Sequence, residues 1–467
     1  MTASGDPPAL AGEGSVTAAR RAAYEVLRRT FEQGAWTDRA FPAAAERHGL
    51  DPRERAQAQR LAYGAVQRRG TADHVVEGAA NRPVHEIDPP LTAALRLGVY
   101  ELLFAAATPD HAAVDQAVEL AKAGMGGDGR RARAGAGLVN AVLRRIAGER
   151  DALLAGLGDD TPEEAALAHS FPLWLARMWW EELGAGAARS LMAAMNEPAQ
   201  TALRANTLRI EPARLAAELR AAGQEVERPD APPPLAPPEA LVVRGPLTEP
   251  ARRRLAAGDL VAQSRGSQAV VTALNPRPGE RVLDLCAGPG IKTTAIAARM
   301  GNDGEIIAVE LDPGRASQLR ELCGRLGVTC VKVVEGDAAS ADIGEGYDRV
   351  LVDPPCSDLG ALASRPDARW RKSPELIERV APIQSAILGR GAQAVRTGGT
   401  LVYATCTISV RENEDQLANL LAAAPALRAD DLGRDHPNLR SHRDPRFLQT
   451  RPDRDHTDGF FIARVRR

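Results

Sequence analysis

Lysine, cysteine and long apolar runs are scarce in this sequence. The scarcity of cysteine argues against disulfide-rich and zinc-stabilised proteins, and the lack of long apolar runs argues against membrane-spanning ones. With only four lysines, arginine supplies almost all of the 59 basic residues, which are balanced by 61 acidic ones. This near-neutral charge neither supports nor excludes a nucleic-acid partner. The five cysteines contain no Cys-x-x-Cys pair, which argues against a disulfide framework and against a structural zinc site, so we expect no bound metal.

The length and the hydrophobic pattern indicate an ordinary multidomain globular protein. The chain has 467 residues, of which 44% are hydrophobic and 26% charged, and this suits two to four domains. No apolar stretch approaches the roughly 18 residues of a membrane span. The first residues, with Asp6 and Glu13, do not resemble a signal peptide. We therefore expect a cytoplasmic protein.

The N-terminal third has the pattern of an all-helical domain. Over residues 15–147, apolar residues recur at helical spacing, most clearly in Ala19–Arg29 and Leu91–Ala106. The glycine-rich, basic stretch 126–137 precedes a helix that we expect to start near Leu138. Two interpretations of this stretch stay open, a flexible connector and an arm that contacts RNA.

The middle of the chain is predicted to be a small mixed segment. Residues 161–223 begin as helices, and Thr201–Asn206 then alternates as a strand does. A proline-rich stretch, 229–238, follows as a stiff connector.

From Val282 onward the pattern changes to an alternation of buried strand, glycine or aspartate turn, and amphipathic helix. Such alternation predicts an α/β domain with a parallel sheet and helices on both faces. The five expected strands are Val282–Cys286, Glu305–Glu310, Cys330–Glu335, Arg349–Asp353 and Thr400–Thr405.

Acidic residues and a glycine-rich turn follow three consecutive strands of this domain. The turn after the first strand lets a ligand approach backbone N–H groups at a helix N-terminus. Glu310 can bind both ribose hydroxyls, and Asp337 with the next N–H can bind an adenine edge. Each acid alone is more simply a helix cap, but together they favour an adenosine cofactor. The residues assigned to this site are Cys286, Ala287, Gly288, Pro289, Gly290, Lys292, Glu310, Arg315, Asp337, Ala338 and Asp353.

Two cysteines end the last two expected strands, so both thiols should lie at the sheet edge where ligands bind. Cys356 follows Asp353-Pro354-Pro355, and Cys406 follows Thr405. A thiolate that adds to C6 of cytosine makes C5 nucleophilic enough to accept a methyl group, and a second thiol can assist release. Asp353 can hold the base edge. This chemistry favours S-adenosylmethionine as the cofactor, although a nicotinamide dinucleotide stays possible from the loop alone.

An amino-group methyltransferase is the nearest competing interpretation of the Asp-Pro-Pro loop. Such loops end in an aromatic residue that stacks on the target base. Here Cys356 occupies that position, which favours carbon over nitrogen as the methyl acceptor.

These motifs closely resemble those of the RNA (cytosine-5) methyltransferase family, and the whole chain resembles its bacterial RsmB (Sun/Fmu) branch, which modifies 16S rRNA. The matching stretches are Asp284–Thr293, Asp353–Ser357, Thr405-Cys406, Arg365-Pro366-Asp367 with Trp370, and Asp458–Phe461. The resemblance implies that Cys406 is the nucleophile, that Cys356 acts in product release, and that Lys292 and Asp353 belong to the catalytic set.

The helical N-terminal region resembles the NusB-type RNA-binding fold. The matching runs are Arg96–Leu102, His111–Val118 and Val139–Arg144. The expected organisation is therefore a NusB-like domain over 1–150, a small α/β linker domain, RRM-like, over 151–258, and a Rossmann-like methyltransferase domain over 259–467.

The resemblance also implies the partners. We expect a monomer that acts on 16S rRNA before the subunit is fully assembled and that binds neither membrane nor DNA. A tRNA cytosine-5 methyltransferase and a catalytically idle RNA-binding or assembly protein remain alternatives. Ile291 departs from the usual glycine, which would strain the backbone if φ were positive there, and Pro355 replaces the usual alanine.

Overall fold

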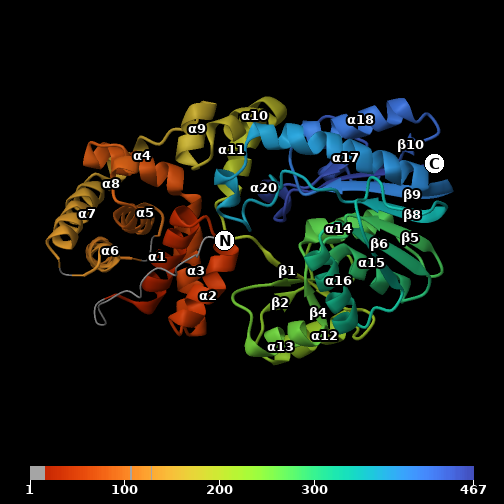
Figure 1. Ribbon diagram of the computed structural model, residues 1–467, viewed down its shortest axis with the longest axis horizontal. Coiled ribbons are helices and arrows are strands. Elements are labelled where there is room, and N and C mark those ends of the chain that lie inside the picture. The colour runs from red at the N-terminus through yellow and green to blue at the C-terminus, as the bar shows by residue number, and fades with distance from the viewer. Residues whose placement is uncertain (1–15, 106–107, 128) are drawn as a thin grey trace. The chain divides into compact units, whose positions relative to one another are not determined.

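The computed structural model describes residues 16–105, 108–127 and 129–467. The predictions made for the first fifteen residues, and for the helix end at Ala106, lie outside this range. The chain forms two compact units (Figure 1). Unit 1 consists of the described residues up to Asn196 together with Ser364–Arg371, and unit 2 consists of Glu197–Ala363 and Lys372–Arg467.

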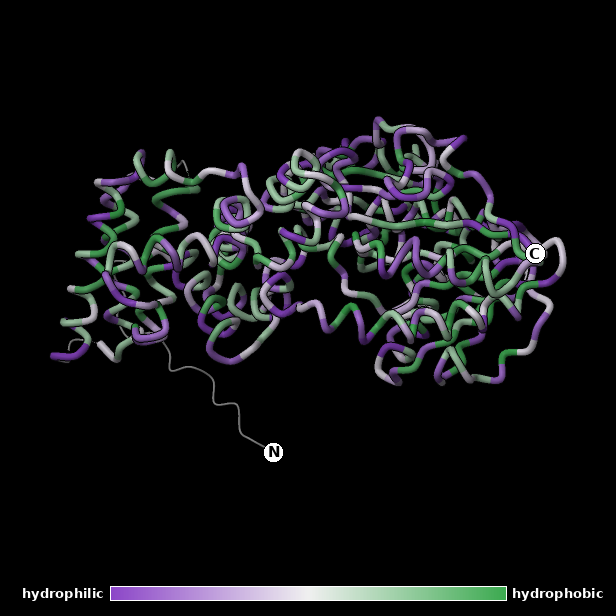
Figure 2. The backbone as a smooth tube through the Cα atoms, turned by 90° about the horizontal axis from the view of Figure 1, so that it is seen from above, coloured by the Kyte–Doolittle hydropathy of each residue, from purple (hydrophilic) through white to green (hydrophobic). Residues whose placement is uncertain are grey.

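Unit 1 is helical, as the spacing of apolar residues predicted. Its first seven helices pack around one core of apolar side chains, and Figure 2 shows hydrophobic and hydrophilic residues alternating along them. Asp51 and Glu54 form a capping box with Pro52 in the first turn of the third helix, so local sequence fixes where that helix starts. The helices are α1 (Ala18–Glu32), α2 (Thr37–Arg47), α3 (Pro52–Gln67), α4 (Arg69–Ala80), α5 (Pro89–Leu103), α6 (Asp110–Gly124), α7 (Arg130–Gly148), α8 (Arg150–Ala155), α9 (Pro162–Ala168), α10 (Leu173–Leu183) and α11 (Ala185–Ala194), with the 3₁₀ turn η1 (Val84–Glu86).

The loop before α7 is shorter than the loop that the sequence predicted over residues 126–137. Helix α7 begins at Arg130, not near Leu138, so most of 126–137 is helical. Two alanines of this part, Ala132 and Ala136, are buried. The glycines there favour a loop, but burial of this face overrides their low helix propensity.

Unit 1 also contains a short segment from the C-terminal half of the sequence. Residues Ser364–Arg371, with the 3₁₀ turn η2 (Ala368–Trp370), pack among the N-terminal helices. The Trp370 indole N–H donates to the Val66 carbonyl at 2.8 Å. Arg369 is fully buried and donates to the Asn196 side chain at 2.8 Å and to the Met195 carbonyl at 3.0 Å. The Arg-Pro-Asp-x-x-Trp motif thus has a structural role within this unit.

Unit 2 contains a small antiparallel sheet of strand order β2-β3-β1-β4. Helices α12 and α13 contribute Leu215, Leu219 and Ala251 to its core. The strand expected at Thr201–Asn206 is β1, and the proline-rich stretch is a loop, as predicted. The elements are β1 (Thr201–Ala205), α12 (Pro212–Ala221), β2 (Val226–Glu227), β3 (Ala240–Val243), α13 (Glu249–Ala257) and β4 (Leu260–Ala262).

The larger sheet of unit 2 has the order β10-β12-β9-β8-β5-β6-β7, with β11 paired to β12. Strands β7, β6, β5, β8 and β9 are mutually parallel, but β12 runs antiparallel to β9. The five strands expected from the sequence are therefore parallel, as predicted, and the additional antiparallel strand β12 makes the whole sheet mixed. The strands are β5 (Arg281–Leu285), β6 (Glu305–Glu310), β7 (Val331–Glu335), β8 (Tyr347–Val352), β9 (Val395–Thr405), β10 (Arg428–Ala429), β11 (Leu448–Gln449) and β12 (Phe461–Arg466).

Helices cover both faces of this sheet, as expected. Alternate strand residues point to opposite faces, so Val282 packs with α14, α15 and α16 while Leu283 packs with α17 and α18. The helices are α14 (Arg265–Leu274), α15 (Ile291–Met300), α16 (Pro313–Leu326), α17 (Pro374–Ala394), α18 (Glu414–Ala423), α19 (Leu432–Asp435) and α20 (Pro452–Asp455), with the 3₁₀ turns η3 (Val410–Glu412) and η4 (Pro437–Leu439). Among the described helices, none is long and apolar enough to cross a membrane.

Candidate active site

The turn between β5 and α15 has the conformation that close approach of a ligand requires. Cys286, Gly288 and Gly290 all have positive φ. A Cβ on Gly290 would lie 2.2 Å from Leu319, so only glycine fits there, whereas the space beside Gly288 is open. Ile291 begins α15 without a positive φ, so its departure from glycine strains no backbone.

Glu310, at the end of β6, binds this turn directly. One carboxylate oxygen accepts the Gly288 N–H at 2.8 Å, and the other accepts the Asp312 N–H at 2.9 Å. The side chain is buried, and each of its oxygens keeps a further lone pair. Glu310 therefore fixes the glycine turn and can accept additional hydroxyl donors.

The other predicted cofactor residues lie around the same strand ends. Burial raises the pKa of the Cys286 thiol, and the nearby carboxylates of Asp353, Asp284, Glu310 and Asp337 raise it further. These four acids therefore lie near Cys286. The remaining predicted residues differ in exposure: Ala287, Gly290 and Ala338 are buried, Pro289 and Asp337 are exposed, and Arg315 is exposed in the first turn of α16.

Lys292, in the first turn of α15, forms an ion pair with Asp353, which directly follows β8. The Lys292 ammonium lies 2.5 Å from one Asp353 oxygen and 5.1 Å from the centre of the Phe460 ring. Burial opposes its charge, but the Asp353 carboxylate outweighs burial and raises the pKa of Lys292. Lysine thus stays protonated and holds the carboxylate in place.

The two predicted cysteines lie in contact. The sulfur atoms of Cys356, after β8, and Cys406, after β9, are 3.4 Å apart, and both side chains are partly exposed. Both sulfur atoms also lie within hydrogen-bonding distance of the same Asp358 oxygen, at 3.5 Å from Cys356 and 3.0 Å from Cys406. Lys372 binds the other Asp358 oxygen at 3.2 Å.

Both thiols are held in the protonated form. The hydrogen bond with Cys356, and then burial, raise the pKa of Cys406 well above its usual value. The same bond lowers the pKa of Cys356, but burial and the Asp358 and Glu412 carboxylates outweigh it, so that pKa is also raised. Either thiol therefore needs a partner that removes its proton as it reacts.

Three neighbours of the cysteines were missed by sequence reasoning: Asp358, Lys372 and Glu412. Asp358 has a φ of 56°, in the left-handed region that aspartate tolerates better than most residues. Its position two residues after Cys356 was the only signal that could have found it. Glu412 lies six residues after Cys406, in a 3₁₀ turn.

Glu412 connects the two cysteine-bearing loops. Its fully buried carboxylate accepts the Ser357 N–H at 2.8 Å and the Gln384 amide at 3.0 Å. The hydroxyls of Ser357 and Thr407 also bind it. Because these residues directly follow Cys356 and Cys406, one carboxylate fixes the positions of both sulfur atoms.

Three families match separate parts of the chain. Residues 271–466 match the family described as 16S rRNA methyltransferase RsmB/F. Residues 17–148 match the NusB family, and residues 171–246 match an RsmF/B-like ferredoxin-like domain. A protein of Synechocystis named probable ribosomal RNA small subunit methyltransferase B is 34% identical over 96% of this chain and 99% of its own length. The chain belongs to the RsmB/F methyltransferase family.

A second relative and two solved structures also match the chain. The Bacillus subtilis protein with the same description is 32% identical over 97% of this chain and 99% of its own length. The crystal structure of PH0851 covers 98% of this chain and 100% of its own, with a TM-score of 0.80 and 26% identity. A methyltransferase homologue from Pyrococcus horikoshii covers 66% of this chain and 99% of its own, with a TM-score of 0.57 and 26% identity.

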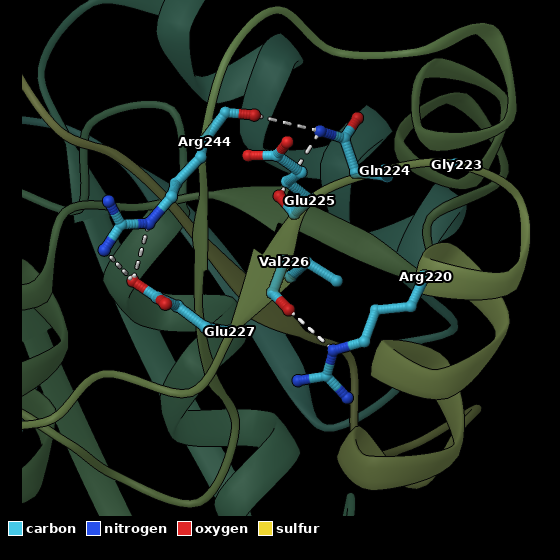
Figure 3. Close-up of a pocket in the computed structure, with 7 residues that line it drawn as sticks. All are labelled: Arg220, Gly223, Gln224, Glu225, Val226, Glu227 and Arg244. Atoms are coloured by element: carbon cyan, nitrogen blue, oxygen red, sulfur yellow. Dashed lines mark hydrogen bonds and ion pairs between the residues drawn. The ribbon is translucent and has the colours of Figure 1, made fainter.

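A separate hollow lies elsewhere in unit 2. It borders the edge strand β2, has a volume of about 450 Å³ and is lined by seven residues, none of them a predicted site residue (Figure 3). Its two arginines are engaged, Arg244 with Glu227 and Arg220 with the Val226 carbonyl. The hollow therefore adds nothing to the active site.

Proposed function

We propose that this protein transfers a methyl group from S-adenosylmethionine to C5 of a cytosine in 16S rRNA through a covalent bond between Cys406 and C6. The observation that carries the proposal is the contact of two thiols, 3.4 Å apart, beside the Lys292–Asp353 pair at adjacent strand ends. Family membership supports methyl transfer, and the names of the relatives support small-subunit rRNA as the substrate.

The donor set around β5, β6 and β7 fits S-adenosylmethionine. Glu310 has free acceptor capacity for ribose hydroxyls, the space beside Gly288 is open, and Asp337 is exposed at the next strand end. Cys286, Ala287, Pro289, Gly290, Arg315 and Ala338 would line the same site. When bound, the cofactor supplies a methyl group on a positively charged sulfonium.

In the first chemical step, the Cys406 sulfur forms a bond to C6 of the cytosine as its proton leaves. Asp358 lies 3.0 Å from this sulfur and can accept the proton at Oδ1. The Asp353 carboxylate can accept a hydrogen bond from the cytosine N4 amino group, and the Lys292 ammonium paired with it can stabilise the negative charge that develops at N3. The C5 atom is then nucleophilic and can take the methyl group.

In the second step, the C5 proton passes to solvent, its electron pair re-forms the C5–C6 double bond, and the Cys406 sulfur leaves C6 and takes back the proton held by Asp358. Cys356 contacts Cys406 directly, so it is placed to assist this elimination. The roles are sequential: Cys406 begins the covalent intermediate and Cys356 ends it.

The substrate is tested by bisulfite sequencing of total RNA from cells with and without the gene. We expect one 16S rRNA cytosine to lose its protection in the deletion strain and to regain it when the wild-type gene is returned. A gene encoding Cys406→Ala should not restore it. Protection lost in tRNA instead would overturn the rRNA assignment, and unchanged protection throughout would overturn cytosine-5 methylation.

A further inference from the structure

Cys356, Cys406 and Asp358 present three metal-ligating atoms to one point. The two sulfur atoms and one carboxylate oxygen all lie within 4.8 Å of one another. The proposed function uses the two thiols in sequence and needs no third ligand between them. The cysteines are 50 residues apart in the sequence, so this group has none of the spacing of a structural zinc motif.

The distances between these atoms are close to those of a tetrahedral site. Zinc binds sulfur at about 2.3 Å and carboxylate oxygen at about 2.0 Å, so tetrahedral angles require about 3.8 Å between two sulfurs and about 3.5 Å between sulfur and oxygen. The observed separations are 3.4 Å between the sulfurs and 3.0 and 3.5 Å from sulfur to oxygen. Adjustments of about 0.5 Å or less would create three of the four metal bonds.

The surroundings would support such an ion. Lys372 binds the Asp358 oxygen that faces away from the sulfurs and so fixes the carboxylate in a one-oxygen binding mode. Two thiolates and one carboxylate around a divalent cation leave one negative charge, which Lys372 balances. Glu412 holds the residues that follow both cysteines, so the ligands are preorganised.

We propose that Cys356, Cys406 and Asp358 form a binding site for a thiophilic divalent cation, of the Zn²⁺ and Cd²⁺ class, and that occupation blocks catalysis. Binding would replace two S–H bonds by two metal–sulfur bonds and release two protons to the solvent, with no oxidation or reduction. A water molecule would complete the tetrahedron. The binding stands on the geometry alone, whereas the loss of catalysis rests on the proposed function.

Cadmium titration of the reduced, chelator-treated full-length protein tests the binding. The probe is Cd²⁺ alone, followed by its thiolate-to-metal ultraviolet absorption and by calorimetry. Cys323 and Cys330 lie near each other elsewhere in unit 2, so the matched control is the double variant Cys323→Ala/Cys330→Ala. We expect one high-affinity equivalent in the wild type and in this control.

The single variants Cys356→Ser and Cys406→Ser should each lose at least 100-fold in affinity, and Asp358→Asn should lose about 10-fold or more. Far-ultraviolet circular dichroism checks that each variant is folded, and if one cysteine variant unfolds the other decides. Tight binding retained in either cysteine variant, tight binding lost in the control, or unchanged affinity in Asp358→Asn would overturn the site.

Methyl transfer measured with Zn²⁺ and with a chelator separates this inference from the proposed function. Stoichiometric inhibition that the chelator reverses is the expected result. Cysteine-dependent binding in a protein with no cytosine-5 activity under any condition would leave the metal site standing and remove the proposed function. Full activity with no cysteine-dependent binding would remove the metal site alone.

Discussion

Replacing Glu412 should separate the structural support of the cysteines from their chemistry. Glu412→Ala removes the acceptor of the Ser357 N–H and leaves that buried donor without its partner, which costs about 1–3 kcal/mol. Loss of the bonds from Gln384 and Thr407 adds about 0.5–1.5 kcal/mol each. Glu412 is itself buried with a raised pKa, so removing it relieves part of this cost. The expected net loss of unfolding free energy is about 2–4 kcal/mol.

Glu412→Gln is the matched control. It keeps one carbonyl oxygen for the Ser357 N–H and the Gln384 amide, and its new NH₂ group can donate to the two hydroxyls. Its unfolding free energy should stay within about 1 kcal/mol of the wild type.

Equilibrium urea unfolding and the kcat for methyl transfer to 16S rRNA measure the two effects. Glu412→Ala should lower kcat at least tenfold, because both cysteine loops lose their common anchor, whereas Glu412→Gln should retain most of it. An alanine variant with unchanged stability and unchanged kcat would refute the positioning role. So would a glutamine variant as damaged as the alanine one.

Three further changes test other parts of the account. Glu310→Ala should weaken S-adenosylmethionine binding about 10–150-fold, measured by calorimetry, because charge-assisted bonds worth about 1.5–3 kcal/mol are lost. The control Glu310→Gln should weaken binding less. Unchanged affinity in the alanine variant would remove Glu310 from the site. Arg369→Ala should lower the unfolding free energy by at least about 2 kcal/mol, because buried acceptors on Met195 and Asn196 lose their donor. A change in unfolding free energy of under about 0.5 kcal/mol would contradict this role of Arg369. Burial raises the pKa of Asp284 to about 7, so folding keeps it protonated where the unfolded chain ionises, and the unfolding free energy should fall as the pH rises from about 4 to 7. Asp284→Asn should remove that part of the pH dependence, and an identical pH profile in the variant would show that Asp284 does not cause it.

The strand ends that carry the active site could be predicted from sequence because each is a local pattern. A buried apolar run followed by an acid or a cysteine marks the end of a strand, and parallel strands bring such ends to one edge. Glu310, Asp353, Cys356 and Cys406 were found in this way, and the structure places them at the ends of β6, β8 and β9. Their roles as catalytic or cofactor residues stay predictions.

The features that were missed depend on contacts between distant residues. Trp370 donates to Val66 across 304 positions of sequence, and no local pattern shows that Ser364–Arg371 packs among the N-terminal helices. The antiparallel pairing of β12 with β9 also joins segments that are far apart in the sequence, as in the pair Phe461 and Thr405. Glu412 carries no motif of its own, and its significance appears only when Ser357 and Thr407 are seen to bind it.

The start of α7 was misplaced for a related reason. Glycines over 126–137 indicated a loop, yet burial of Ala132 and Ala136 makes the helix favourable from Arg130 onward. Packing decided the boundary, and packing cannot be inferred from composition.

The covalent intermediate between Cys406 and C6 can be detected by denaturing electrophoresis of each cysteine variant after incubation with 16S rRNA and S-adenosylmethionine. Cys356→Ala should accumulate an RNA-linked protein band that survives denaturation, because methyl transfer proceeds while elimination stalls. Cys406→Ala should form no such band and should not methylate. A band with Cys406→Ala and none with Cys356→Ala would reverse the two roles, and methylation retained in both variants without any band would contradict thiolate catalysis.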